Sequence, residues 1–146
     1  PAHALSFKEG VSYSFLLSHP LLGNGPFALI QPSAGFIPGQ NKGIAVNTVF
    51  LGTGGLGKLD ASHMADYWQE MVLNTGAKQV YLIHWDNFTL PLMQQGVPTS
   101  LQAMPNLVDD FAKSLRELRK LSLRDDVGLN VLNAWNLVEF QKPETD

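Results

Sequence analysis

The chain has 146 residues, of which 45% are hydrophobic and 16% charged, with four histidines and no cysteine. This length and composition fit a single globular domain spanning residues 1–146, and they exclude disulfides and thiolate metal sites. The formal net charge of −3 argues against a nucleic-acid partner, which needs clustered Lys and Arg. No stretch approaches the roughly 20 apolar residues of a membrane span.

The first third of the chain predicts a hairpin followed by a loop. Apolar residues alternate with smaller ones across residues 11–17, as in a half-buried strand, and residues 27–30 form a second short apolar run. The Gly and Pro residues at 23–26 make the turn between them. Residues 31–39 contain two prolines and two glycines, so we expect an irregular loop there.

The middle of the chain predicts a strand, a glycine-rich turn, a helix and another strand. Residues 46–51 are mostly apolar, which indicates a strand buried on both faces. Asp60 is a good residue to begin a helix, and Gly76 a good residue to end one. The helix should bury one stripe of side chains, namely Met64, Tyr67, Trp68, Met71 and Val72. The next strand should run from Gln79 to Ile83.

The last third predicts one more helix and one more strand. Residues 88–105 look irregular because they contain three prolines and a glycine. A second helix should begin near Asn106 and bury Val108, Phe111, Leu115 and Leu118. Residues 127–132 form a possible last strand, and residues 141–146 a polar tail. Together these elements predict an α/β fold with a mixed sheet.

His84 is the first candidate for a functional residue, because it ends a predicted strand and precedes Trp85 and Asp86. Sites in α/β proteins gather where strands end and loops begin. Neutral imidazole is a common zinc ligand, and its second nitrogen usually needs a hydrogen-bond partner. The alternative is a structural histidine whose ring is satisfied by the backbone at a strand end.

The glycine cluster at residues 52–57 has two interpretations. It reads G-x-G-G-x-G after a strand, which approaches the dinucleotide fingerprint G-x-G-x-x-G. However, the third glycine comes one residue early, and the next strand ends in His84 rather than in an acidic residue about 20 positions on. We therefore favour a tight turn between strand and helix, with no bound nucleotide cofactor.

Several segments resemble metallo-β-lactamase-fold hydrolases. These are Phe50-Leu51-Gly52 with the glycines that follow, and Ile83-His84-Trp85-Asp86-Asn87-Phe88 with Pro91-Leu92, separated by one helix. The loop Ser33-Ala34-Gly35-Phe36 with Pro38-Gly39 is similar to a loop in one branch of that superfamily. The resemblance covers roughly residues 11–92 and corresponds to the C-terminal half of the fold.

The resemblance implies half of an αββα four-layer sandwich, in which a mixed β-sheet carries two main helices on one face. It also implies a site for zinc or another divalent metal at a sandwich edge, where metal-bound hydroxide attacks an ester, amide, lactone or phosphodiester. His84 matches the last metal-binding histidine of the family, and His3 the histidine that precedes it. Asp86 matches a residue that supports a ligand without binding the metal.

The chain also departs from the family. The main metal motif, H-x-H-x-D-H, is absent, and residues 31–33 stand where most members carry a metal-bridging aspartate. Since zinc needs three or four converging ligands, we expect this chain alone to bind metal poorly and to be inactive. The resemblance thus predicts the C-terminal portion of a longer hydrolase that acts on a small molecule.

An exposed apolar sheet face would further predict a dimer or other homo-oligomer, or association with the missing N-terminal half. The alternative function is a non-enzymatic small α/β domain that binds a partner or ligand. The composition is compatible with any compartment, and the absence of a visible signal peptide slightly favours the cytoplasm.

Overall fold

The fold is organised around one mixed five-stranded sheet. The computed structural model describes residues 12–140, and the sheet order is β1-β2-β3-β4-β7. The strands are β1 Phe15–Ser18, β2 Pro26–Gln31, β3 Thr48–Gly52, β4 Gln79–Ile83 and β7 Gly128–Val131. β1 pairs antiparallel with β2, and the other neighbouring pairs are all parallel. The predicted α/β class and the predicted hairpin are therefore confirmed.

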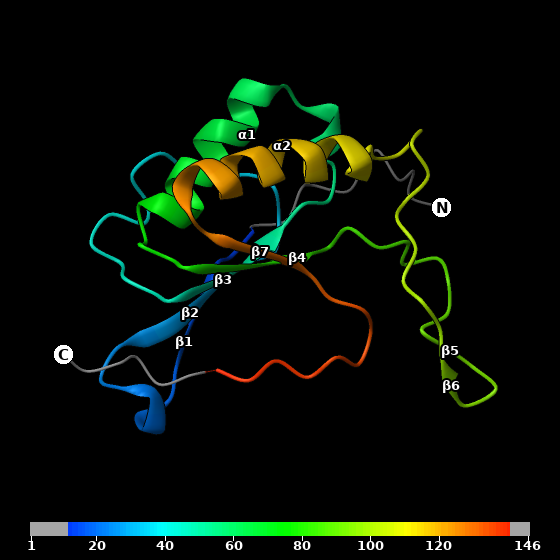
Figure 1. Ribbon diagram of the computed structural model, residues 1–146, viewed down its shortest axis with the longest axis horizontal. Helices are drawn as coiled ribbons and strands as arrows, with labels where there is room; N and C mark the ends of the chain where they lie inside the picture. The colour runs from blue at the N-terminus through cyan, green and yellow to red at the C-terminus, as the bar shows by residue number, and fades with distance from the viewer. Residues whose placement is uncertain (1–11, 141–146) are drawn as a thin grey trace, which may run out of the picture.

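Both main helices lie on the same face of this sheet (Figure 1). Helix α1, Ala61–Trp68, continues into a π-helical turn, η4 Gln69–Leu73, and helix α2 is Phe111–Asp125. The carboxylate of Asp60 accepts a hydrogen bond from the His63 backbone N–H at 2.8 Å, so Asp60 begins α1 as predicted. In the part of the chain that the structure describes, no helix is long and apolar enough to cross a membrane.

Three short elements lie in the connections. Two are single 3₁₀ turns, η2 Pro20–Leu22 and η3 Leu56–Lys58. The third is a small hairpin of β5 Met93–Gln94 and β6 Val97–Pro98. The hairpin interrupts the segment 88–105, which is otherwise irregular as expected.

The core lies between the helices and the adjacent sheet face. Leu29, Val49 and Val80 pair across β2, β3 and β4 and are almost completely buried. The predicted helical stripe is confirmed, because all of its members are buried against that face: Met64, Tyr67, Trp68, Met71 and Val72. The indole of Trp68 also donates to the Asp125 carboxylate at 2.9 Å, which ties α1 to the end of α2.

Two predicted starts were wrong by several residues, that of the second helix and that of the first strand. The second helix begins at Phe111, not near Asn106, because the Asp110 carboxylate accepts from the Lys113 N–H at 2.9 Å and caps the helix there. Val108 therefore lies before the helix and is 55% exposed. The first strand begins at Phe15 rather than at residue 11, which lies outside the described residues, as does the tail 141–146.

The opposite sheet face carries an apolar row that no helix within residues 12–140 covers. Phe15, Ile30, Phe50 and Tyr81 occupy one register line across the four strands β1 to β4. The rings of Phe50 and Tyr81 stack with centroids 5.5 Å apart, and Phe15 is 53% exposed. We call this row the bare-face row. Ile30, Phe50 and Tyr81 are half-buried, so Phe15 is the exposed end of the row.

The chain after β7 runs along this same face (Figure 1). The ring of Phe140 meets the rings of Phe27 and Phe50 edge-on, at centroid distances of 4.9 and 6.0 Å. Phe27 is the extra residue of a β-bulge, since Leu17 pairs with Ala28 and Ser18 with Pro26. The bulge thus allows Phe27 to join this aromatic contact.

Candidate functional site

The candidate site lies at the edge of the sheet where the parallel strands end. His84 directly follows β4, and its side chain is exposed. Its backbone φ is +55°, a left-handed conformation that non-glycine residues seldom adopt, although His does so more often than most. Such strained positions persist only where the surrounding structure maintains them, and they are more frequent at functional sites than elsewhere. This geometry makes His84 the starting point for a functional hypothesis.

The His84 ring is held in one orientation by the loop that follows β2. Its Nδ1 lies 3.0 Å from the carbonyl oxygen of Pro32. Because a carbonyl oxygen only accepts hydrogen bonds, Nδ1 carries the proton and donates it. In the neutral ring, Nε2 therefore has a free lone pair, and Nε2 makes no hydrogen bond within residues 12–140. This is the protonation pattern of a histidine that can bind a metal through Nε2.

The two other histidines in the described part of the chain differ from His84 in this respect. His19 uses Nδ1 to accept from the Leu21 N–H at 3.3 Å, so its proton sits on Nε2. His63, in the first turn of α1, is half-buried, and its Nε2 donates to the Ala34 carbonyl at 3.2 Å. His3, the second predicted metal ligand, lies outside the described residues.

The loop that orients His84 is itself fixed by buried polar side chains. The amide of Gln31 donates to the carbonyls of Ser33 and Gly35 at 3.0 and 2.7 Å. The hydroxyl of Tyr67 lies 2.9 Å from the carbonyl oxygens of both Ser33 and Gly52. Burial raises the pKa of Tyr67 far above its usual range, so this phenol stays a hydrogen-bond donor.

The glycine-rich loop is packed closely against His84. A Cβ on Gly54 would lie 2.9 Å from the His84 carbonyl oxygen and 3.0 Å from its ring. A Cβ on Gly52 would lie only 2.3 Å from the Pro32 carbonyl oxygen, the acceptor of the His84 hydrogen bond. These two glycines are therefore required so that β2, β3 and β4 can converge at this edge.

Asp109 is a site residue that our sequence analysis missed. The residue is 2% exposed, and its carboxylate accepts from the backbone N–H groups of Gly55 and Gly57 at 3.1 and 3.0 Å. The amides that would cradle a phosphate in a nucleotide-binding loop thus already have an anionic partner, which favours the turn interpretation. The only sequence signal was the pair Asp109-Asp110, of which one member caps α2.

A cavity of about 170 Å³ opens beside His84. Its polar wall consists of His84, Asp86 and Asp109, and its apolar wall of Phe88, Met104 and Val108, with Gly54 and Gly55 between them. Asp86 is half-buried and shares the cavity with His84, but the partner of His84 Nδ1 is the Pro32 carbonyl rather than this carboxylate. The structure therefore brings the two predicted residues to one cavity without a direct bond.

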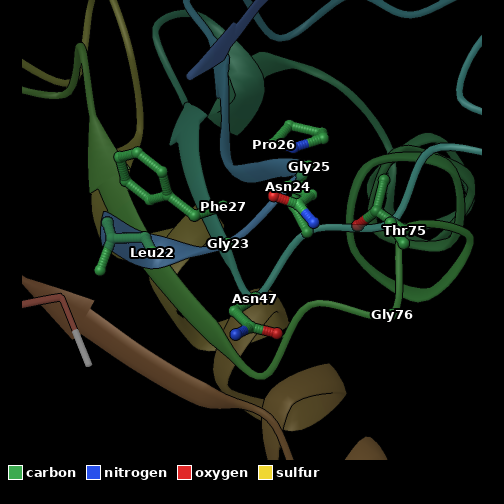
Figure 2. A pocket seen from close by; sticks show the side chains of 11 residues that line it. Leu22, Gly23, Asn24, Gly25, Pro26, Phe27, Asn47, Thr75 and Gly76 are labelled. Carbon is green, nitrogen blue, oxygen red and sulfur yellow. The ribbon is translucent and has the colours of Figure 1, made fainter. Parts of the chain in front are cut away.

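A second cavity, of about 320 Å³, lies at the opposite end of the strands. Figure 2 shows it between the segment Leu22 to Phe27 and the segment around Thr75 and Gly76. Its lining contains no charged side chain, and the Thr75 hydroxyl is within 3.0 Å of the carbonyls of Met71 and Val72. It offers no acid, base or free nucleophile, so we do not treat it as a reactive site.

Within residues 12–140, no group of three or more His, Cys, Asp or Glu side chains is arranged to hold a metal ion. His84 can therefore contribute one ligand but cannot by itself form a zinc site. Comparison of the chain with protein-family models, with curated proteins and with solved structures gave no match in any of the three.

Proposed function

We propose that this chain is the C-terminal portion of a metal-dependent hydrolase of the metallo-β-lactamase superfamily. The observation that carries the proposal is the geometry of His84. The ring is exposed at the carboxyl edge of the parallel strands, and its Nδ1 proton is fixed on a backbone carbonyl. The mixed sheet with both helices on one face also agrees with half of a four-layer sandwich.

His84 fits zinc or another divalent metal as a single ligand through Nε2. Zinc sites in enzymes use three protein ligands, so the remaining donors must come from outside residues 12–140, with His3 one candidate. Bound metal would supply an activated water and polarise the bond to be cleaved, in an ester, amide, lactone or phosphodiester. We expect the isolated chain to hold metal poorly and to be inactive.

The role of this chain's own residues would be to orient His84. The carbonyl oxygen of Pro32 accepts a hydrogen bond from the ring Nδ1–H, while Gln31 and Tyr67 hold the loop that contains Pro32. Asp86 remains a predicted supporting residue, because it lines the same cavity and would place negative charge near a bound cation.

A non-enzymatic binding domain is the competing function. One hydrogen bond from a histidine ring to a backbone carbonyl, as His84 makes with Pro32, is also what a structural histidine would have. The two hypotheses differ in the activity expected of the full-length protein that contains this chain, here called the full translated product. Only a hydrolase needs further metal ligands.

The test is hydrolysis by the full translated product that contains this sequence. We expect it to cleave at least one member of a panel of nitrophenyl esters, lactones, amides and phosphodiesters. Removal of metal with a chelator should abolish that activity, and zinc or another divalent metal should restore it. Activity that survives exhaustive chelation, or a product that lacks any H-x-H-x-D-H stretch, would favour the binding domain.

We further propose that the bare-face row mediates association, with a second copy when the chain is isolated and with the N-terminal half in the full protein. Phe15, at the end of this row, is 53% exposed, and exposed apolar surface often marks an interaction site. Phe15→Lys should convert a sedimenting dimer into a monomer, because a charge would be buried in the contact. Leu123→Lys is the matched control, since Leu123 is 84% exposed on α2. A wild-type chain that remains monomeric at high concentration contradicts the proposal.

A further inference from the structure

The cavity beside His84 has one apolar wall and one polar wall, and this difference limits which substrate groups it can bind. One wall is apolar, formed by Phe88, Met104 and Val108. Phe88 and Val108 are 72% and 55% exposed, so apolar surface at this rim faces solvent next to the proposed metal ligand. Pockets that bind small molecules are mostly apolar, with a few convergent polar groups that fix orientation.

The charges around this cavity do not favour an anionic ligand. Its charged lining residues are the two acids Asp86 and Asp109, with no Lys or Arg among the lining residues. Lys58 and Lys113 lie on adjoining segments, but their ammonium groups donate to the backbone carbonyls of Asn106 and Leu59. A phosphodiester anion placed here would lose hydration without gaining a cationic side chain from this wall.

The size of the cavity limits what it can accept. A cavity of about 150 Å³ holds a benzene-sized group, and this one measures about 170 Å³. An apolar group of up to about six carbons therefore fits while the reacting bond remains near His84.

We propose that this cavity receives an uncharged apolar group of the substrate. The inference rests on the proposed hydrolase function and narrows its substrates to those that carry a short, uncharged acyl or alkyl chain next to the bond to be cleaved. The apolar wall would hold that chain, and Val108 and Phe88 would determine its length.

The first test measures binding to this chain and requires no activity. We expect N-butylacetamide, a neutral probe, to shift the backbone NMR signals of Gly54, Gly55 and Phe88 in a saturable manner. Diethyl phosphate at equal concentration should not shift them. Val108→Asp should weaken binding of N-butylacetamide at least ~10-fold, because it places a charge on the apolar wall. Leu107→Asp is the matched control, since Leu107 is adjacent, 92% exposed and outside the lining.

Equal weakening by the two aspartate variants, or equal shifts with diethyl phosphate, would overturn the inference. The second test uses the full translated product, in which Val108→Asp should raise KM for a butyryl ester more than KM for an acetyl ester. If the product hydrolyses nothing, the proposed function fails, and the N-butylacetamide titration still decides whether the cavity selects a neutral apolar group.

Discussion

His84→Asn in the full translated product should lose bound metal and hydrolytic activity together. Asn also tolerates the left-handed backbone at φ +55°, and its side-chain amide can donate to the Pro32 carbonyl as the ring does. The substitution thus removes the Nε2 lone pair with little disturbance of the loop. Loss of a supporting residue near a metal costs about 10- to 100-fold in affinity or activity, so loss of a ligand should cost at least ~100-fold.

Metal content by elemental analysis and kcat on the best substrate are the two measurements. His19→Asn serves as control, because His19 is exposed and its Nδ1 is used by the Leu21 N–H. Unchanged metal occupancy in His84→Asn would remove this residue from the ligand set.

In the wild-type chain, long-range ¹H–¹⁵N spectra of the imidazole should show the Nδ1-protonated form for His84 and the Nε2-protonated form for His19.

Asp109→Ala should destabilise the chain by about 2–4 kcal/mol. Hydrogen bonds to charged groups contribute about 1.5–3 kcal/mol each, and a buried donor left unpaired costs about 1–3 kcal/mol. Here the substitution removes the acceptor of two N–H groups, and that of Gly57 is buried. Water can reach the exposed Gly55 N–H, and relief of the buried charge offsets part of the loss, which keeps the estimate below the sum of both bonds.

Urea unfolding followed by tryptophan fluorescence measures this change in the free energy of unfolding. Asp109→Asn should have a smaller effect, since its single carbonyl oxygen can still accept one of the two bonds. Asp66→Asn is the matched control, because Asp66 is an exposed residue on α1 and should change stability by less than ~0.5 kcal/mol. An Asp109→Ala variant as stable as this control would show that the contact to the glycine loop contributes nothing.

Sequence patterns that act over a few residues correctly predicted several helices and strands. The strand Gln79–Ile83 and the helix capped by Asp60 appear where the sequence indicated them, because alternation, periodicity and capping act over a few residues. The start of α2 was misplaced because Val108 continues the apolar spacing of the helix, whereas Asp110 supplies the cap. The apolar spacing and the capping residue thus indicated different starts for α2, and the helix begins directly after the capping residue.

The candidate site was only partly predictable because its key contacts join distant residues. The sequence identified His84 at a strand end, but the bond from its ring to Pro32 spans 52 positions. The bonds from Asp109 to the glycine loop span 52 and 54 positions. Nothing near Asp109 or Pro32 in the sequence indicates such partners. They become evident only when the parallel strands place their loops at one edge.

The strand order β1-β2-β3-β4-β7 advances in a single direction, so every parallel crossover steps to the same side. Right-handed crossovers that all step one way must put their connections on one face. Such a sheet never reverses its winding, and it therefore lacks the switch point at which doubly wound proteins open a crevice for a nucleotide. The cavity beside His84 is accordingly bounded by the loops that follow β3 and β4 and by the segment before α2, rather than by a crevice between two oppositely wound halves of the sheet.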